Sequence, residues 1–508
     1  MRAPEILGGV APLTLEAVDR IAAGAPVVLD TTARERLVRS HRQLATLVAA
    51  GRVVYGLNTG CGPLCDRPVS PEDGARFQLN LVRSHATGVG APHPTEVVRA
   101  TMAVRAQTLA QGRSAVRPAV VEQLVAMLNA GITPLVPEIG SVGASGDLVE
   151  LAHVARAVAG EGLVERDGRR LPAAAAFAEA GLSALVLEGR EALAMMNGTS
   201  CEAAQAALVV VGAQRLVAAA EIAAALVLEV FGANAEAFDE RVHRVRPQPG
   251  QLASAAHLRA LLDGSRRLED TVARGVPGAE RARPVQDAYT LRCVPQVLGA
   301  VRDTIAHVRD VVAVEINAVT DNPVFFPEDD TVLHAGNFHG QPLALAADHL
   351  KVALAEIALF SERRLARLLD PATNEGLPPF LIRDAAGLRS GLMGLQYCAS
   401  ATVAENAVLA HPASLGSVPT NANNQDVVGM GTVAVRQARR LLENGRRVVA
   451  IELLAAAEAL DLRGTDGLGT GTRAAYAAVR AIVAPLLEDR PLGDDVERLA
   501  AALDTLSA

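Results

Sequence analysis

The longest apolar segment of the chain, CEAAQAALVVVGAQRLVAAAEIAAALVLEVFG, begins at Cys201 and carries small or aliphatic side chains around most of a helical circumference. A helix of this kind must be covered on nearly all sides, so it belongs in the centre of a bundle or in an oligomer interface. Arg215 and Glu221 interrupt the segment, which favours a buried helix over a membrane span. The segment therefore predicts a large helical core.

Three more segments repeat the helical spacing, with apolar residues every three or four positions. They are PTEVVRATMAVRAQTLAQG, RPAVVEQLVAMLNAG and HLKVALAEIALFSERRLARLLD. Strand signals are few: RVVYGL, and GLVERDGRRLP with a turn at Asp167-Gly168 that predicts a hairpin. We expect a mainly α fold with an N-terminal mixed domain over 1–199 and a helical-bundle domain over 200–508. A Pro/Gly-rich connection is expected over 275–284.

Composition narrows the classes of function. The formal charge of −8 and the dispersed arginines argue against a nucleic-acid surface. The N-terminus has Glu5 and prolines where a secretory signal needs an apolar core, so we expect a cytoplasmic protein without a membrane segment. The chain has five cysteines and no zinc-ligand spacing, a pattern that fits reduced thiols and no metal site.

The stretch GSVGASGDLVELAH, residues 140–153, places one serine among small residues just before a helical pattern. It lacks the lysine of a phosphate loop, and Asp147 stands where a nucleophile elbow around Ser145 needs glycine. One remaining interpretation is a turn in which Ser145 or Asp147 caps the next helix. The other is a backbone that cyclises: the Gly146 nitrogen attacks the Ala144 carbonyl, water is lost, and a methylidene-imidazolone results. Glycine tolerates the bent backbone that this ring needs.

The segment GSVGASGDL resembles the part of the histidine, phenylalanine and tyrosine ammonia-lyases that forms this prosthetic group. Other blocks resemble the same family, in the same order, along nearly the whole chain: YGLNTGCGPL, NLVRSHATGVG, MMNGTS, QDAYTLRCVPQVLGA, EINAVTDNPVFF, GNFHGQP and VAENAVLAHPAS. The chain is identified as a member of this family, closest to its histidine ammonia-lyases. The resemblance implies a fumarase/aspartase-like architecture and a lyase that removes ammonia from an aromatic amino acid. It also implies a methylidene-imidazolone formed from Ala144, Ser145 and Gly146, with no added metal or nucleotide.

The resemblance assigns roles to further residues. Tyr55, in the loop YGLNTGCG, would take the β-proton of the substrate. The site must then stabilise a phenolate, for which helix N-termini are candidates. Tyr289 would be a further catalytic residue, and the substrate-binding residues would be His85, Asn197, Gln286, Arg292, Phe338 and Glu405.

The chemistry of these side chains fits the roles. The planar fork of Arg292 matches a substrate carboxylate, and Asn197 can donate to that carboxylate or to the imidazolone oxygen. Gln286, Tyr289 and Arg292 follow one another at one-turn spacing, so they can face one cavity. Phe338 would pack against the prosthetic group or the substrate ring.

The sequence constrains the identity of the substrate less than it constrains the reaction. His85 follows Ser84 as in histidine lyases, and together with Glu405 it could hold an imidazole, so we expect L-histidine to become trans-urocanate in histidine catabolism. Ser200 and the segment NNQDVV at 423–428 resemble the tyrosine and phenylalanine branch instead. A tyrosine or phenylalanine ammonia-lyase and an aromatic 2,3-aminomutase stay open, as does a non-catalytic helical scaffold from another class.

Two positions depart from the family pattern. Val149-Glu150 stands for Ala-Pro after the prosthetic-group segment, and losing the proline could loosen the helix that follows. Cys61 stands for an aromatic residue in the base loop. The apolar helices after residue 200 predict a homo-oligomer, most simply a tetramer, because one subunit's loops cannot cover them. The resemblance adds that active sites combine residues of several subunits.

Overall fold

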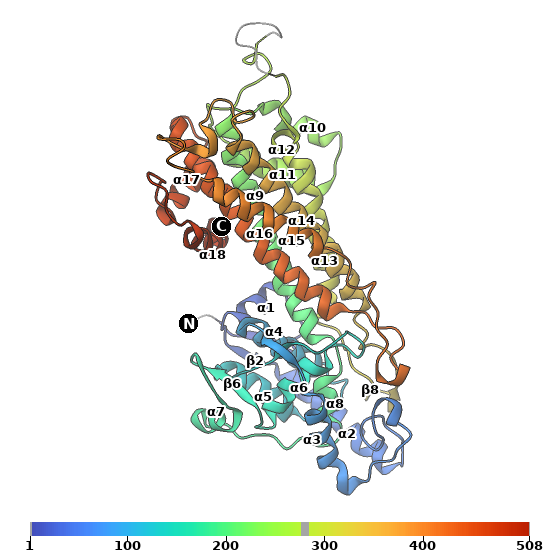
Figure 1. Ribbon diagram of the computed structural model, residues 1–508. Coiled ribbons are helices and arrows are strands. Elements are labelled where there is room, and N and C mark those ends of the chain that lie inside the picture. The colour runs from blue at the N-terminus through green and yellow to red at the C-terminus, as the bar shows by residue number, and fades with distance from the viewer. Residues whose placement is uncertain (1–2, 276–283, 507–508) are drawn as a thin grey trace. The chain divides into compact units, whose positions relative to one another are not determined.

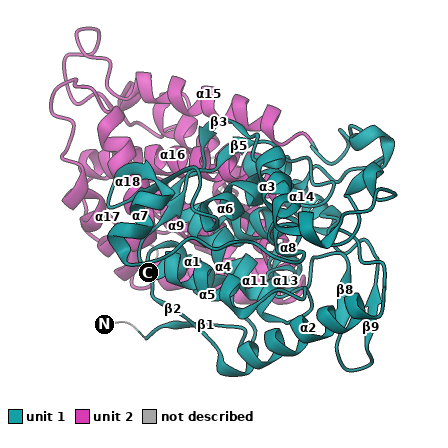
Figure 2. Cartoon of the chain, turned by 90° about the horizontal axis from the view of Figure 1, so that it is seen from below, with its two compact units in different colours: residues 1–211, 308–348, 412–436 teal, residues 212–307, 349–411, 437–508 magenta. Residues whose placement is uncertain are grey.

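The structure is a computed structural model that describes residues 3–275 and 284–506. The Pro/Gly-rich connection expected over 275–284 lies almost wholly outside the described residues. The chain forms two compact units: residues 1–211, 308–348 and 412–436 make the first, and 212–307, 349–411 and 437–508 the second (Figure 2). Among the described residues, eighteen α-helices outnumber nine short strands, so the mainly α fold is confirmed. The division into domains 1–199 and 200–508 stays a prediction.

The strands of the first unit form four small sheets. One is parallel, β1 (Glu5–Leu7) with β2 (Val27–Leu29); the antiparallel pairs are β3 (Val89–Pro92) with β5 (Pro137–Ile139), β4 (Thr133–Pro134) with β6 (Leu163–Arg166), β6 with β7 (Arg169–Pro172), and β8 (Val324–Phe326) with β9 (Thr331–Leu333). The hairpin expected at Asp167-Gly168 is β6–β7 and is confirmed.

The helices that lie wholly in the first unit are α1 (Leu15–Ala22), α2 (Thr31–Ala49), α3 (Gly74–His85), α4 (Thr95–Ala110), α5 (Pro118–Asn129), α6 (Leu148–Val158), α7 (Ala173–Ala180) and α8 (Glu191–Met196). Helix α4 is central, because every residue from Val97 to Ala110 is buried and the helix packs on α1, α2 and α5. Its buried arginines, Arg99 and Arg105, donate to backbone carbonyls.

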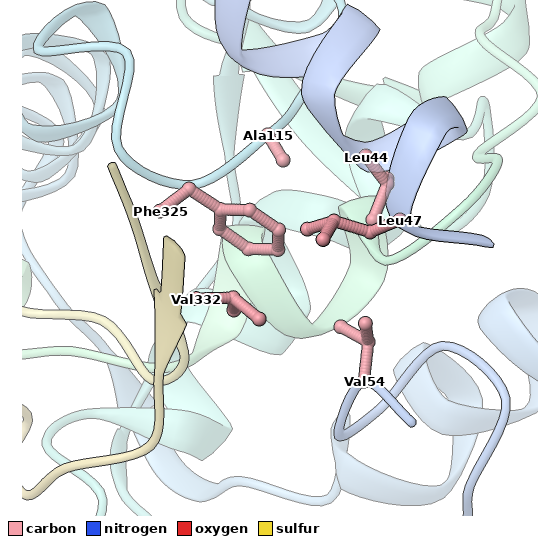
Figure 3. Close-up of a cluster of buried hydrophobic side chains, with 6 residues drawn as sticks. All are labelled: Leu44, Leu47, Val54, Ala115, Phe325 and Val332. Atoms are coloured by element: carbon pink, nitrogen blue, oxygen red, sulfur yellow. The ribbon is translucent and has the colours of Figure 1, made fainter. Parts of the chain in front are cut away.

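The segment RVVYGL, expected as a strand, is a turn. The backbone N–H of Val54 donates to Asn58 Oδ1 at 2.9 Å, and that of Leu57 donates to the Val54 carbonyl at 3.2 Å. Val54 is buried in a cluster with Leu44, Leu47, Ala115, Phe325 and Val332 (Figure 3). The strand prediction was wrong: the backbone of this segment forms hydrogen bonds within its own turn, and the Val54 side chain packs on distant residues. The cluster anchors the start of the loop that carries Tyr55.

The second unit is built from helices. Four long helices contain residues of both units and have their larger parts in the second: α9 (Ser200–Phe231), α13 (Val294–Glu315), α14 (Gln341–Leu369) and α16 (Gly431–Arg463) (Figure 1). The shorter helices of the second unit are α10 (Glu240–Arg244), α11 (Pro249–Leu261), α12 (Tyr289–Arg292), α15 (Met393–Leu409), α17 (Thr470–Ile482) and α18 (Gly493–Leu506).

Ion pairs with fully buried carboxylates join the long helices within the second unit. Arg302 of α13 donates to Glu221 of α9 at 2.9 Å, and Arg364 of α14 donates to Glu452 of α16 at 2.9 Å. Of the described helices, α9 alone is long and apolar enough to cross a membrane, but 78% of its most apolar window is buried. The expectation of a buried core helix is therefore confirmed.

Candidate active site

The stretch 140–147 is a turn that leads into α6. Gly143 and Gly146 have positive φ angles of 72° and 68°. Asp147 precedes the helix but makes no side-chain cap, and the Ser145 hydroxyl accepts a hydrogen bond from Gln425 at 3.0 Å. The helix-capping interpretation of Ser145 and Asp147 therefore fails.

A second segment, 197–202, holds this turn on both sides of Gly146. The backbone N–H of Gly198 donates to the Ser145 carbonyl at 3.1 Å, and that of Asp147 donates to the Gly198 carbonyl at 2.8 Å. The Asp147 carboxylate accepts from the N–H groups of Cys201 and Glu202 at 2.7 and 3.0 Å. The turn is thus fixed by backbone contacts made some fifty residues away in sequence, with the Gly146 N–H outside this hydrogen-bond network.

Only glycine fits at the two positions where these segments meet. A Cβ on Gly146 would lie 2.0 Å from the Gly198 oxygen, and a Cβ on Gly198 would lie 2.3 Å from the Thr320 oxygen. Both distances are far below contact, and both residues have positive φ. The close approach of two backbones explains the glycines independently of any family pattern.

Glu150, one of the two departures noted in the sequence, makes contacts that a proline could not. Its carboxylate accepts a short hydrogen bond from the Ser141 hydroxyl, and the same hydroxyl accepts from the Val149 N–H at 3.1 Å. Burial raises the pKa of Glu150. These bonds tie the first turn of α6 back to residue 141. The loosening expected from the lost proline stays a prediction.

The serine faces a cavity of about 540 Å³ in the first unit. Its polar lining includes Tyr55, Cys61, Asn80, Ser84, His85, Ser145, Asn197 and Gln425, and its apolar lining includes Phe77, Leu81, Leu148, Leu193 and Met196. Four predicted site residues from different parts of the chain, Tyr55, His85, Ser145 and Asn197, therefore line one cavity. An apolar pocket with a few polar groups is the usual form of a small-molecule site.

Tyr55 is held by its own loop. Its hydroxyl accepts a hydrogen bond from the Gly62 N–H at 2.6 Å and is hydrogen-bonded to the Cys61 side chain. Burial, and secondly Cys61, raise the pKa of Tyr55 to about 12, while the Gly62 N–H opposes the shift. The single N–H donor does not offset burial, so a pKa of about 12 favours the phenol in the isolated chain. The stabilised phenolate expected from the sequence stays a prediction.

His85 ends α3 with one ring nitrogen engaged. Its Nδ1 lies 2.9 Å from the Leu81 carbonyl oxygen and 3.1 Å from the Ser84 hydroxyl, and because the carbonyl can only accept, the nearer contact favours a hydrogen on Nδ1. In a neutral ring the other nitrogen, Nε2, is then an acceptor. Because His85 lines the cavity, it can accept a hydrogen bond from a polar substrate ring.

Asn197 is buried and its amide is already in use. Nδ2 donates to Asp321 Oδ1 at 3.1 Å, and Asp321 forms a buried ion pair with Arg190 at 2.8 Å. Although burial opposes it, Arg190 holds the pKa of Asp321 below its ordinary value. Asn197 is therefore held by the Arg190–Asp321 ion pair, next to the Ser145 turn.

Comparison with known proteins identifies the family. Residues 13–481 match the family model described as aromatic amino acid lyase. The chain belongs to the aromatic amino acid lyase family. The histidine ammonia-lyase of Symbiobacterium thermophilum is 49% identical to this lyase over 96% of the chain and 95% of its own length.

Solved structures are similar to this chain over nearly its whole length. The tyrosine aminomutase from Streptomyces globisporus is 41% identical with a TM-score of 0.95, covering 99% of this chain and 97% of that one. The histidine ammonia-lyase from Trypanosoma cruzi is 34% identical with a TM-score of 0.89, covering 99% and 94%. The expected fold class, family and class of enzyme are confirmed.

The other predicted site residues of the lyase do not line this cavity. Phe338 lies in the first unit, half-buried, ahead of α14. The second unit holds the rest: Gln286 is exposed, Tyr289 is 70% exposed, and the Arg292 guanidinium lies 4.9 Å from the Tyr289 ring centre. Glu405, half-exposed in α15, lies 3.8 Å from Arg440. Their roles in the site stay predictions.

Gln425 is a cavity residue in contact with Ser145 that sequence reasoning did not select. Its amide donates to the Ser145 hydroxyl, and its oxygen accepts from Thr420 at 2.6 Å. The segment NNQDVV, which resembles the tyrosine and phenylalanine branch, contains this glutamine and was the sequence signal for it. Ser200, the other branch marker, is buried outside the cavity lining. Only one of the two markers of the tyrosine branch therefore faces the cavity.

Proposed function

We propose that this lyase eliminates ammonia from L-histidine to give trans-urocanate. The observation that carries the proposal is the Ala144-Ser145-Gly146 turn, held bent by residues 197–202 at the wall of a cavity that also contains Tyr55 and His85. The residues present fit a methylidene-imidazolone: Gly146 has the positive φ and the crowding that exclude a Cβ, and the Ser145 hydroxyl faces the cavity. Once formed, that group supplies an electrophile for the substrate amine.

Each cavity residue then has a task. Tyr55 takes the proton from the substrate β-carbon, which requires that substrate binding or partner groups lower its pKa from about 12. His85 accepts a hydrogen bond from the imidazole N–H through Nε2. Asn197, supported by Asp321, lies where it can orient the amino acid or the imidazolone oxygen.

The remaining roles are proposed for residues that do not line the cavity, most of which lie in the second unit. Arg292 would bind the substrate carboxylate, and its Nε is buried without a hydrogen-bond partner among the described residues. Gln286 and Tyr289 would assist it, Glu405 would hold the imidazole with His85, and Phe338 of the first unit would pack on a ring. The family resemblance implies that active sites combine several subunits, so we expect partner subunits to contribute some of these residues.

A homo-oligomer, most simply a tetramer, follows from the same proposal. Val352 and Leu359 of α14 and Val408 of α15 are 55%, 41% and 75% exposed in the single chain, and apolar surfaces of this kind indicate a partner. Light scattering should give the mass of four chains, and an active monomer would contradict the proposal. The five cysteines are free, which supports a reducing, cytoplasmic location.

Relatives support histidine as the substrate, since several histidine ammonia-lyases are 43–49% identical over most of the chain. The second candidate is a tyrosine lyase or aminomutase, which Gln425 in the cavity and the 41% identical tyrosine aminomutase favour. A phenylalanine ring would leave His85 unpaired, at a cost of about 1–3 kcal/mol, or roughly tenfold to a hundredfold.

One experiment separates the candidates. The purified enzyme is given histidine, tyrosine or phenylalanine, and the ultraviolet band of each unsaturated acid is followed, with Ser145→Ala as the inactive control. Urocanate is the expected product. Coumarate without urocanate would overturn the histidine assignment, and a β-amino acid would identify an aminomutase. Absence of any product, with an unmodified 140–153 peptide in the mass spectrum, would favour the helical scaffold.

A further inference from the structure

Arg105 of α4 is a buried cation that the proposed chemistry does not use. Its side chain is fully buried, and it donates to the Asn197 carbonyl at 2.8 Å, to the Ala194 carbonyl at short range, and to the Ser200 hydroxyl at 3.4 Å. No carboxylate of the described residues accepts a hydrogen bond from it, and its Nε has no partner. All of its polar contacts therefore go to one segment, 194–200.

An unpaired buried guanidinium is expensive. Burial lowers the pKa of Arg105 to about 10, and Asp321 acts on it only at longer range. Removing a cation from water without a bonded anion costs several kcal/mol. Arg190, buried nearby, offsets part of this cost because it pairs with Asp321 at 2.8 Å. Fold stability alone would be served better by an apolar side chain at 105, so a second role is indicated.

The segment that Arg105 holds is the one that grips the Ser145 turn. Gly198 exchanges backbone hydrogen bonds with Ser145 and Asp147 on one side. On its other side, a Cβ at Gly198 would lie 2.6 Å from Arg105 Nη1. Gly198 thus bonds to the turn through its backbone and lies close to both the guanidinium and the Thr320 carbonyl, so Arg105 takes up part of the space into which Gly198 could move.

We propose that Arg105 is a positioning residue for closure of the Ala144-Ser145-Gly146 ring, an inference that rests on the proposed function. In ring closure the Gly146 nitrogen bonds to the Ala144 carbonyl carbon and passes its hydrogen to the oxygen. That hydroxyl leaves as water with the Ser145 N–H hydrogen, and the Ser145 hydroxyl leaves as water with the Cα hydrogen. Two waters are released and no oxidant is needed, so the requirement on the protein is geometric.

Arg105 meets that requirement through backbone carbonyls. By fixing the carbonyls of residues 194 and 197, it fixes the 197–198 peptide, whose N–H donates to the Ser145 carbonyl. It thereby also positions Gly198, whose own carbonyl accepts from the Asp147 N–H on the other side of the reacting nitrogen. Preorganising reacting atoms at close range accounts for large rate factors in intramolecular reactions. Arg105 needs to contact neither substrate nor the reacting atoms to have this effect.

The test compares two buried arginines of the same helix. Arg99 is also buried and also donates to carbonyls, those of Ile21 and Leu128 at 3.1 and 3.0 Å, but it does not contact 194–200. Arg105→Lys, Arg105→Met, Arg99→Lys and Arg99→Met are produced as full-length chains. For each, the dehydrated fraction of the 140–153 peptide is followed with time by mass spectrometry, next to the melting temperature and the turnover per dehydrated site.

We expect the Arg105 variants to dehydrate about tenfold to a hundredfold more slowly than the Arg99 variants, the factor lost with one or two charge-assisted hydrogen bonds. Turnover per dehydrated site should stay at the wild-type value. Dehydration of folded Arg105→Lys as fast as Arg99→Lys would overturn the inference. So would failure of both Arg105 variants to fold while the Arg99 variants fold, because Arg105 would then serve the fold itself. A wild-type peptide that loses no water would instead overturn the proposed function.

Discussion

Glu202→Gln should stabilise the folded chain by an amount that grows as the pH rises from 5. The Glu202 side chain is fully buried, and neither carboxyl oxygen has a hydrogen-bond partner among the described residues. Burial, followed by the charges of Asp147 and Glu315, raises its pKa well above the ordinary value. The folded chain is therefore expected to hold Glu202 as a neutral acid.

Two helix N-termini near the Glu202 carboxyl favour its ionised form, but their effect is too small to remove the proton. A Cβ at Gly340, just before α14, would meet Glu202 Oε1 at 1.8 Å, and one at Gly431, the first residue of α16, would meet Oε2 at 2.0 Å. Helix N-termini favour an anion by about 0.3–1 kcal/mol each. Burying an unpaired carboxylate costs several kcal/mol, so the proton stays on.

The magnitude follows from proton linkage. In the unfolded chain the carboxyl ionises at about pH 4.3. Above that pH the folded chain binds one proton more than the unfolded chain, so its stability falls by about 1.4 kcal/mol per pH unit up to the folded pKa. For as long as the folded chain keeps this proton, the group alone removes about 2 kcal/mol between pH 5 and pH 6.5. Glutamine does not titrate, so the variant lacks this loss.

Urea unfolding of the two proteins at pH 5 and pH 6.5, at one protein concentration, measures the difference. Glu221→Gln is the control, because Glu221 is equally buried but accepts from Arg302 and His257, which keep its pKa below the ordinary value although burial opposes them. That variant should be destabilised at both pH values. If Glu202→Gln gained nothing over wild type between pH 5 and pH 6.5, Glu202 would be ionised in the folded chain and the reasoning would be refuted.

Three further outcomes are expected. Gly146→Ala should abolish dehydration of the 140–153 peptide, since the added Cβ would lie 2.0 Å from a backbone oxygen. Gly181 has the same φ of 68° but open space around it, so Gly181→Ala should leave dehydration of that peptide unchanged. Cys65, which is exposed, should react with iodoacetamide at neutral pH well before Cys61, because burial raises the Cys61 pKa to about 11; equal labelling rates would contradict this. Phe325→Ala, which empties the centre of the buried cluster in Figure 3, should cost about 3–5 kcal/mol of unfolding free energy, and a loss below about 1 kcal/mol would show that the cluster is loosely packed.

The sequence alone was sufficient wherever a property depends on neighbouring residues. Helical spacing predicted the apolar helix α9, and the turn dipeptide Asp167-Gly168 predicted the β6–β7 hairpin. The Ala144-Ser145-Gly146 triplet with its flanking blocks identified the family, because the atoms that would react lie in consecutive residues. In each case the determining interactions act over a few positions, and the residue order records them directly.

The tertiary structure decided everything that depends on segments far apart in the chain. Val54 of RVVYGL packs on Phe325, and no local pattern encodes that contact. Gln425 reaches Ser145 across 280 positions, which is why spacing could not select it. The pKa of Tyr55 rises because the folded chain removes water from the phenol, a property that the loop sequence does not possess. Burial and long-range hydrogen bonds come into being only when the chain folds, so they can be read only from the folded chain.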